Sequence, residues 1–177
     1  MVLSISEYFS KHWEHDTSYK YSWDALIDIV NDLKPAHVLD VGCGNNYFKG
    51  KINNLWGIDP YNLKADQKIG VCDLGRYRTY EVILALGSIN FGSETVINKQ
   101  MRIINNLLES NGHLFMRLNP GLDHHWSEGK SEDVNFFPWT KEKLEAFALA
   151  YGYSILEWQE DPNSHGSMRY YAHLYKW

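Results

Sequence analysis

A buried-type strand that runs directly into a glycine turn constrains this chain more than any other feature of its sequence. The segment Val38–Asn46 reads VLDVGCGNN, an apolar stretch followed by Gly42 and Gly44. Glycine adopts backbone angles that other residues avoid, and its missing side chain lets a ligand approach the main chain. A helix that follows such a turn offers free amides at its N-terminus. The alternative is a strand-to-loop turn that needs glycine only for its dihedral angles.

Two aspartates sharpen this interpretation. Asp40 precedes Gly42 by two residues, where its carboxylate can orient the turn or accept a bond from a ligand ammonium group. Asp59 ends the next apolar stretch, Leu55–Asp59, and an acid at that point of an open α/β sheet can accept both hydroxyls of a ribose. Taken singly, Asp59 is better explained as a surface aspartate before Pro60. Together with the glycines, it favours a ligand site.

Apolar stretches along the chain alternate between strand-like and helix-like patterns. Seven have the composition of strands: His37–Val41, Leu55–Asp59, Ile69–Cys72, Val82–Leu86, His113–Leu118, Tyr153–Gln159 and Met168–Lys176. Three helical patterns run from a capping residue to a stop: Ser22 to Pro35, Ser93 to Gly112 and Thr140 to Gly152. This alternation predicts a doubly wound, Rossmann-like α/β fold with a mostly parallel seven-stranded sheet and helices on both faces. A turn-rich loop, DPNSHG, predicts that the last strand is antiparallel.

The connection between the third and fourth predicted strands is shortened. Only Leu74–Glu81 lies between them, whereas a parallel crossover takes about a dozen residues or more. Either the domain is trimmed at this point or the third strand is misplaced. Since no repeat, low-complexity tract or linker divides the chain, we expect one domain over residues 1–177, with residues 1–22 as an N-terminal cover segment.

Composition argues against several classes of function. The formal net charge of −5 does not supply the cationic surface that dominates nucleic-acid affinity, and we see no clear basic patch. No apolar run approaches membrane-spanning length, and the first residues lack the apolar stretch of a signal peptide. Cys43 and Cys72 lack metal-ligand spacing and are expected to be reduced thiols. We therefore expect a cytoplasmic protein without membrane attachment or a metal site.

The glycine turn and its two acids resemble the class I S-adenosylmethionine (SAM)-dependent methyltransferases. In that family a strand ending in D/E-x-G-x-G-x-G cradles the methionine part of SAM, an acid after the second strand holds the ribose, and a polar residue after the third strand meets the adenine. The resemblance implies SAM as cofactor and a binding site formed by the matching residues and their neighbours: Asp40, Gly42, Cys43, Gly44, Asn46, Asp59, Pro60, Asp73, Leu86, Gly87 and Ser88. The segments LGSINFG and FFPWT are similar to those of small methyltransferase-like proteins of phage or bacterial type.

The chain departs from the family pattern at two positions. Asn46 replaces the third glycine, and asparagine tolerates left-handed backbone angles, so binding can survive the exchange. The short connection after the third strand leaves the role of Asp73 open. A dinucleotide-binding G-x-G-x-x-G pattern would have Tyr47 at its last glycine, which disfavours a nicotinamide-dependent reductase. Gly87–Phe91 lacks the prolines that nucleobase N-methyltransferases carry there, which favours a small molecule over nucleic acid as acceptor.

Catalytic candidates are few. His124 and His125 lie in the loop after the fifth predicted strand, expected over the cofactor, and either could act as a base for a hydroxyl acceptor, oriented by Asp123. A solvated polar loop is the alternative, and adjacent histidines on an extended segment point apart, which argues against a metal site. Near the same rim, aromatic residues either form an acceptor platform or complete the core: Tyr47, Phe91, Trp126, Phe136, Phe137 and Trp139, with core favoured for the last two.

The sequence therefore predicts a SAM-dependent methyltransferase (EC 2.1.1 type) whose unidentified acceptor is a small molecule or an exposed polymer group, with a small molecule preferred to nucleic acid. A SAM-binding regulatory or interaction module without catalysis is the alternative, because no motif in the chain identifies an acceptor or a base with the same force as the cofactor motif.

Overall fold

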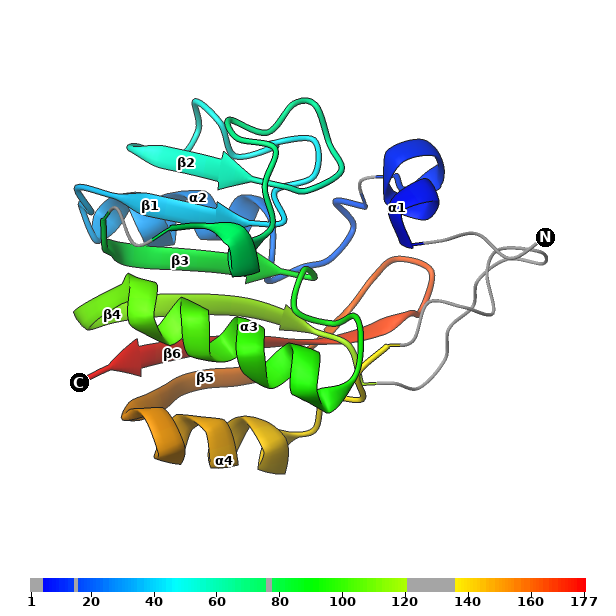
Figure 1. The fold of residues 1–177 in the computed structure, drawn as a ribbon. Coiled ribbons are helices and arrows are strands. Elements are labelled where there is room, and N and C mark those ends of the chain that lie inside the picture. The colour runs from blue at the N-terminus through cyan, green and yellow to red at the C-terminus, as the bar shows by residue number, and fades with distance from the viewer. Residues whose placement is uncertain (1–4, 15, 76–77, 121–135) are drawn as a thin grey trace.

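The computed structural model describes residues 5–14, 16–75, 78–120 and 136–177. Its centre is a six-stranded sheet in the order β2-β1-β3-β4-β6-β5, flanked by helices (Figure 1). The strands are β1 (Val38–Val41), β2 (Leu55–Ile58), β3 (Tyr80–Leu86), β4 (Leu108–Leu118), β5 (Tyr153–Pro162) and β6 (Met168–Lys176). The helices and short helical turns are α1 (Ile5–Glu7), η1 (Tyr8–His12), α2 (Asp24–Asp32), η2 (Val71–Asp73), α3 (Glu94–Leu107) and α4 (Lys141–Tyr151).

The sheet is mostly parallel. β1 lies between β2 and β3 and is parallel to both, and β4 is parallel to β3. β6 is antiparallel to both of its neighbours, β4 and β5. All four residues of β1 are buried, as expected for a central parallel strand that is covered on both faces. The predicted mostly parallel sheet with an antiparallel last strand is therefore confirmed.

Helices cover both faces of the sheet (Figure 1). In that view α3 and α4 lie in front of the sheet and α2 lies behind it. α2 buries Leu26 and Val30 in one apolar cluster. The opposite cluster contains the apolar stripes of α3 and α4: Ile97, Met101, Ile104, Leu144, Phe147 and Ala148. Within the described ranges, no helix is both long enough and apolar enough to span a membrane.

The predicted third strand is wrong. Ile69–Cys72 forms no strand; η2 begins at Val71, and the described residues form six strands instead of seven. The backbone hydrogen-bonding groups at the outer edge of β2 are paired with the loop that follows the strand. The carbonyl of Gly57 accepts hydrogen bonds from the amides of Asp66 and Gln67. Pairing there is reduced to an isolated bridge between Ile58 and Gln67, so no ladder is left for a further strand.

The glycine turn is not followed by a helix. Residues 44–54 form turns and isolated bridges before β2 begins. Asn46, Gly50 and Asn54 have φ values of 57°, 78° and 57°, and such left-handed residues cannot continue a right-handed helix. The expectation of helix-terminal amides beside the ligand site is therefore wrong.

Helix ends follow the predictions in part. Ser22 does not cap α2; its Oγ donates to Asp161 Oδ2 over 2.7 Å. α3 ends at Leu107 instead of reaching Gly112, because the chain enters β4 there. Thr140 caps α4 by accepting from the amide of Lys143, and Gly152 ends that helix with a left-handed φ of 74°, both as predicted.

Candidate functional site

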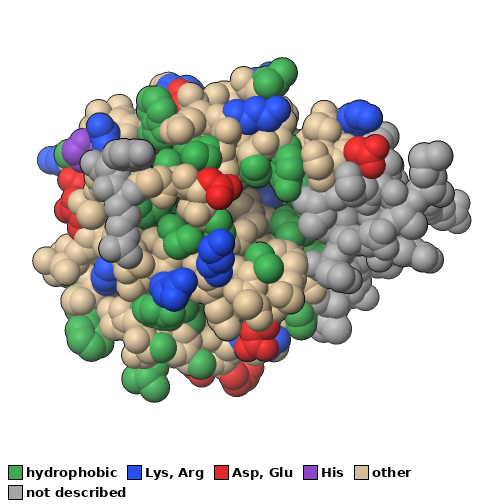
Figure 2. Space-filling view, in the orientation of Figure 1, with side chains coloured by type: hydrophobic (Ala, Val, Ile, Leu, Met, Phe, Trp, Pro, Cys, Tyr) green, Lys and Arg blue, Asp and Glu red, His purple; other side chains and the backbone are tan. Residues whose placement is uncertain are grey.

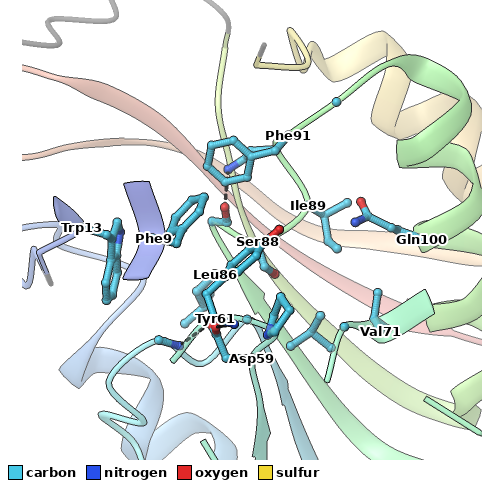
Figure 3. Close-up of a pocket in the computed structure, with 18 of the residues that line it drawn as sticks. Phe9, Trp13, Asp59, Tyr61, Val71, Leu86, Ser88, Ile89, Phe91 and Gln100 are labelled. Atoms are coloured by element: carbon cyan, nitrogen blue, oxygen red, sulfur yellow. Dashed lines mark hydrogen bonds between the residues drawn. The ribbon is translucent and has the colours of Figure 1, made fainter. Parts of the chain in front are cut away.

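A cavity of about 460 Å³ lies where the parallel strands end. This volume is within the range of about 300–1,000 Å³ that is usual for small-molecule sites. Residues from the ends of β1, β2, β3 and β4, and from η1, line it (Figure 3). The space-filling view shows hydrophobic side chains gathered around a hollow on this face (Figure 2). In a parallel sheet this edge is the expected place for a ligand.

The glycine turn after β1 forms one wall of the cavity. The amides of Gly42 and Cys43 both donate to the carbonyl of Ile58, over 2.8 and 3.0 Å, which ties the turn to β2. Gly42 has a φ of +69°, and a Cβ at this position would lie 2.3 Å from Cβ of Ser88. A Cβ at Gly44 would lie 2.6 Å from the ring of Trp13. Both glycines are thus required for the close approach of neighbouring chain segments.

Asp59 lines the cavity and holds the surrounding loops together. Its Oδ2 accepts from the amide of Gly44 over 3.0 Å. Its Oδ1 accepts from the amides of Tyr61 and Asn62, each over 2.8 Å. A carboxylate oxygen accepts about two hydrogen bonds, so Oδ2 keeps an acceptor position for a ligand hydroxyl. The residue can therefore fix the glycine turn and bind a ligand at once.

Asp40 lies behind this wall. Its side chain is buried on β1 and is not among the cavity-lining groups. Burial raises the pKa of the Asp40 carboxyl to about 7, and the neighbouring charge of Asp59 adds to the effect. The predicted direct contact of Asp40 with a ligand stays a prediction.

The end of β3, the strand next to β1, forms the adjoining wall. Leu86, Gly87 and Ser88 all line the cavity, as does Pro60 from the loop after β2. Gly87 has a φ of +97°, and its amide donates to the carbonyl of Arg117 over 3.1 Å. The Oγ of Ser88 is buried and has no hydrogen-bond partner among the described residues. A buried hydroxyl without a partner is a natural point of contact for a polar ligand.

No protein-family model and no curated sequence matches this chain, but solved structures do. One is the 1,6-didemethyltoxoflavin N1-methyltransferase of Burkholderia thailandensis, at 16% identity and a TM-score of 0.67 over 86% of this chain and 77% of that one. Another is the N-methyltransferase NodS of Bradyrhizobium japonicum, at 12% identity and a TM-score of 0.67 over 86% and 84%. A third is a SAM-dependent methyltransferase of Clostridium acetobutylicum, at 15% identity and a TM-score of 0.65 over 91% of this chain and 93% of that one.

The chain has the class I SAM-dependent methyltransferase fold. The likeness extends over most of each chain, and the first two structures contain S-adenosylhomocysteine. At these identities the likeness is one of fold. The site within this methyltransferase fold must therefore be judged on its own residues.

Besides Asp40, three of the predicted binding residues lie outside the cavity lining. Cys43 is buried with its Sγ toward β2, and burial raises the pKa of its thiol. Asn46 donates from its Nδ2 to the carbonyl of Lys64 and so holds the loop after β2. Asp73 is exposed at the end of η2, while Ile69, Gly70 and Val71 line the cavity on that side.

The two candidates for the base, His124 and His125, lie outside the described residues, as do Asp123 and Trp126. The described rim aromatics divide as follows: Phe91 and Phe136 line the cavity, whereas Tyr47 does not. Phe137 and Trp139 are 7% and 3% exposed and belong to the core, as predicted.

The N-terminal segment reaches the cavity through residues that the sequence interpretation did not select. Tyr8, Phe9 and Trp13 line it, and Phe9 stacks on Tyr61 with ring centroids 5.8 Å apart. Figure 3 shows Phe9 and Trp13 on one side of the site. Further along the chain, Tyr19 and Trp23 are buried.

Arg117, on β4, is the main residue that sequence reasoning missed. Its side chain lines the cavity. The signal was present: in the apolar strand HLFMRL it is a lone arginine near the strand end, where parallel strands of such folds carry ligand-binding residues.

Proposed function

We propose that this chain binds SAM in the described cavity and transfers its methyl group to a small-molecule acceptor. The observation that carries the proposal is the convergence of Gly42, Gly44, Asp59 and the segment Leu86–Ser88 on one cavity. The sequence selected these positions as a set, and they come from three different strand ends. An ordinary glycine turn would give no reason for them to share a ligand-sized cavity.

The residues present fit the cofactor. Asp59 keeps an acceptor position on Oδ2 for one ribose hydroxyl, and Ser88, whose Oγ is without a hydrogen-bond partner among the described residues, lines the same cavity. Gly42, Gly44 and Gly87 line the same cavity. Ile69 to Val71 supply an apolar wall suited to the adenine ring.

Methyl transfer from SAM does not require a covalent intermediate on the protein. When bound, SAM supplies a methyl group on a sulfonium; the bond to the acceptor forms as the sulfur–carbon bond breaks, and S-adenosylhomocysteine remains. The protein must hold the acceptor in line and exclude water, and orientation alone can contribute about 7–11 kcal/mol to such a step. Phe9, Tyr61 and Phe91 cover the cavity with stacked and edge-on rings and so limit access of water.

A proton acceptor is needed only when the acceptor atom carries a proton at neutral pH. His124 and His125, from the loop after β4, remain our candidates for this role. Substituting each by alanine should lower turnover and leave affinity for S-adenosylhomocysteine within about twofold. Unchanged turnover in both variants would remove the loop from the mechanism.

A small-molecule acceptor is favoured by the proteins of the same fold. The Burkholderia enzyme was crystallised with 1,6-didemethyltoxoflavin. The segment after β3 also lacks the proline motif of the nucleobase N-methyltransferases. These observations support a small molecule without identifying it.

Calorimetric titration with SAM, S-adenosylhomocysteine and NADH tests the proposal. We expect both SAM and S-adenosylhomocysteine to bind and NADH not to bind. If neither binds to the folded protein at high micromolar concentration, the proposal is wrong. If both bind but no labelled methyl group reaches any component of a metabolite extract, the chain is a SAM-binding module without catalysis.

A further inference from the structure

Two arginines line the cavity from neighbouring strands. Arg117 belongs to β4 and Arg169 to β6, which pair antiparallel with Arg117 opposite Tyr171. Arg169 precedes Tyr171 by two positions, so its side chain leaves the same face of the sheet as that of Arg117. Both arginines therefore line the cavity from one face of the sheet.

The guanidinium of Arg117 is held by aromatic rings. Its Cζ lies 4.6 Å from the ring centroid of Tyr19 and 4.8 Å from that of Trp23. Nη2 donates to the carbonyl of Leu86 over 3.3 Å. Nε and Nη1 are buried and have no hydrogen-bond partner among the described residues. Unpaired buried donors on a cation are costly, which points to a ligand that accepts from them.

Neither arginine is neutralised by an ion pair within the described residues. Asp161 and Asp16 both influence Arg117 electrostatically. The oxygens of Asp161 accept from the amide of Tyr21 and the hydroxyl of Ser22, and those of Asp16 accept from Ser18 and Asn163. Arg169 donates from Nη1 to the carbonyl of Met168 over 2.7 Å. Burial lowers the pKa of Arg117 to about 10, so it still carries its charge at neutral pH. Two cations thus line the cavity, and no carboxylate of the described part of the chain lies within ion-pair distance of either.

We propose that Arg117 and Arg169 bind an anionic group of the methyl acceptor, a carboxylate or a phosphate. This inference rests on the function proposed above. Guanidinium groups bind both anions through parallel N–H···O bonds. SAM itself carries a net positive charge, through its sulfonium and ammonium groups against one carboxylate. Its binding beside two unpaired arginines would be unfavourable unless an anion accompanies it.

The carboxylate of the cofactor is a second source of the same chemistry. The glycine turn and Asp59 lie toward β1 and β2, whereas Arg117 and Arg169 project from β4 and β6. We therefore assign them to the acceptor, and the experiment below separates the two sources.

The test uses probes on the full chain, saturated with S-adenosylhomocysteine so that no methyl transfer is involved. Phenyl phosphate, benzoate and the neutral benzamide are titrated by calorimetry. We expect the two anions to bind at least tenfold more tightly than benzamide. Arg169→Gln should abolish this preference and leave affinity for S-adenosylhomocysteine within threefold. Arg102→Gln, at an exposed position of α3, changes the net charge equally and should change neither affinity.

Arg117→Lys is the companion variant, since it keeps the charge but loses the planar fork. It should retain the folded state and weaken phenyl phosphate binding at least fivefold. An equal affinity of the wild-type protein for benzoate and benzamide would overturn the proposal.

A comparison with 5′-methylthioadenosine, which lacks the amino-acid part of the cofactor, distinguishes the two sources. If Arg169→Gln weakens S-adenosylhomocysteine tenfold but leaves 5′-methylthioadenosine unchanged, the arginine serves the cofactor carboxylate and our assignment is wrong. Should S-adenosylhomocysteine fail to bind the wild-type protein, the proposed function fails. The same probe series on the free protein then still decides whether the arginines bind anions.

Discussion

The carboxylate of Asp59 accepts a hydrogen bond from the amide of Gly44 over 3.0 Å, so the end of β2 fastens the turn that follows β1. The other oxygen of Asp59 accepts from the amides of Tyr61 and Asn62. One side chain therefore shapes both loops at this end of the cavity. The residue that sequence reasoning selected as a ligand contact is also a structural link between the two loops.

Asp59→Asn should weaken binding of S-adenosylhomocysteine by about tenfold or more, since a hydrogen bond to a charged group contributes about 1.5–3 kcal/mol. The asparagine Nδ2 would oppose the amide of Gly44, which would loosen the turn as well. Calorimetry at pH 7.5 measures the affinity. Asp28→Asn, at an exposed position of α2, removes the same charge and should have no effect. An unchanged affinity in folded Asp59→Asn would show that this carboxylate is not part of the ligand site.

Gly42→Ala should destabilise the protein more than Gly50→Ala. Both positions have left-handed φ values, +69° and +78°, so both variants carry a similar backbone penalty, about 1–2 kcal/mol. A Cβ at Gly42 would lie 2.3 Å from that of Ser88, whereas at Gly50 it meets nothing within 4 Å. Overpacking of this kind adds about 1–3 kcal/mol. Urea denaturation measures the difference, and equal losses would contradict the close approach of the two turns.

Asp40 predicts a pH dependence of stability. Burial and the nearby Asp59 raise its pKa to about 7 in the folded protein, against about 4 in an unfolded chain. Between these values the folded state binds a proton that the unfolded state has released, so this residue makes the free energy of unfolding fall as the pH rises from about 4 to about 7. Asp40→Asn cannot ionise and should remove that contribution.

The measurement is urea denaturation of wild type and Asp40→Asn at several values between pH 5 and pH 8. The variant should gain stability relative to wild type as the pH rises, whereas Asp28→Asn should not. A constant difference across this range would mean that Asp40 is ionised throughout.

We expect His173 to give the free energy of unfolding a pH dependence of the opposite sign to that from Asp40. Burial, with the neighbouring His113, lowers the pKa of His173 to about 4, against about 6.5 in an unfolded chain. The rings are linked, since Nδ1 of His113 and Nε2 of His173 lie 2.8 Å apart. As the pH falls from about 6.5 to about 4, the unfolded state binds a proton that the folded state does not, so stability is lost.

His173→Gln should make this loss at acid pH shallower. His165→Gln, at an exposed position in the β5–β6 turn, is the matched control and should keep the wild-type slope. Thermal unfolding followed by circular dichroism from pH 4.5 to pH 7 gives both slopes. Identical slopes in His173→Gln and wild type would place the acid sensitivity elsewhere.

Local sequence signals predicted the elements that depend on few neighbours. Thr140 and Gly152 were correctly predicted as the two ends of α4, because helix capping and left-handed termination depend only on residues close in the sequence. The prediction of a third strand was wrong because a strand depends on a partner that is distant in the sequence. Gly57 receives its hydrogen bonds from the amides of Asp66 and Gln67, and this loop closure has no local signature. The strand pattern of Ile69–Cys72 carried no information about whether a partner edge was free.

The sequence by itself determined the mostly parallel sheet, the turn at Gly42 and Gly44 and the acid at Asp59, because apolar periodicity and glycine spacing are properties of the chain. Only the tertiary structure decided which polar groups share a cavity. Asp40 and Asn46 do not line it, whereas Arg117 and Arg169, which are 52 positions apart, line it from the paired strands β4 and β6. Such placement depends on strand order and register, since these decide which side chains face one another across the sheet.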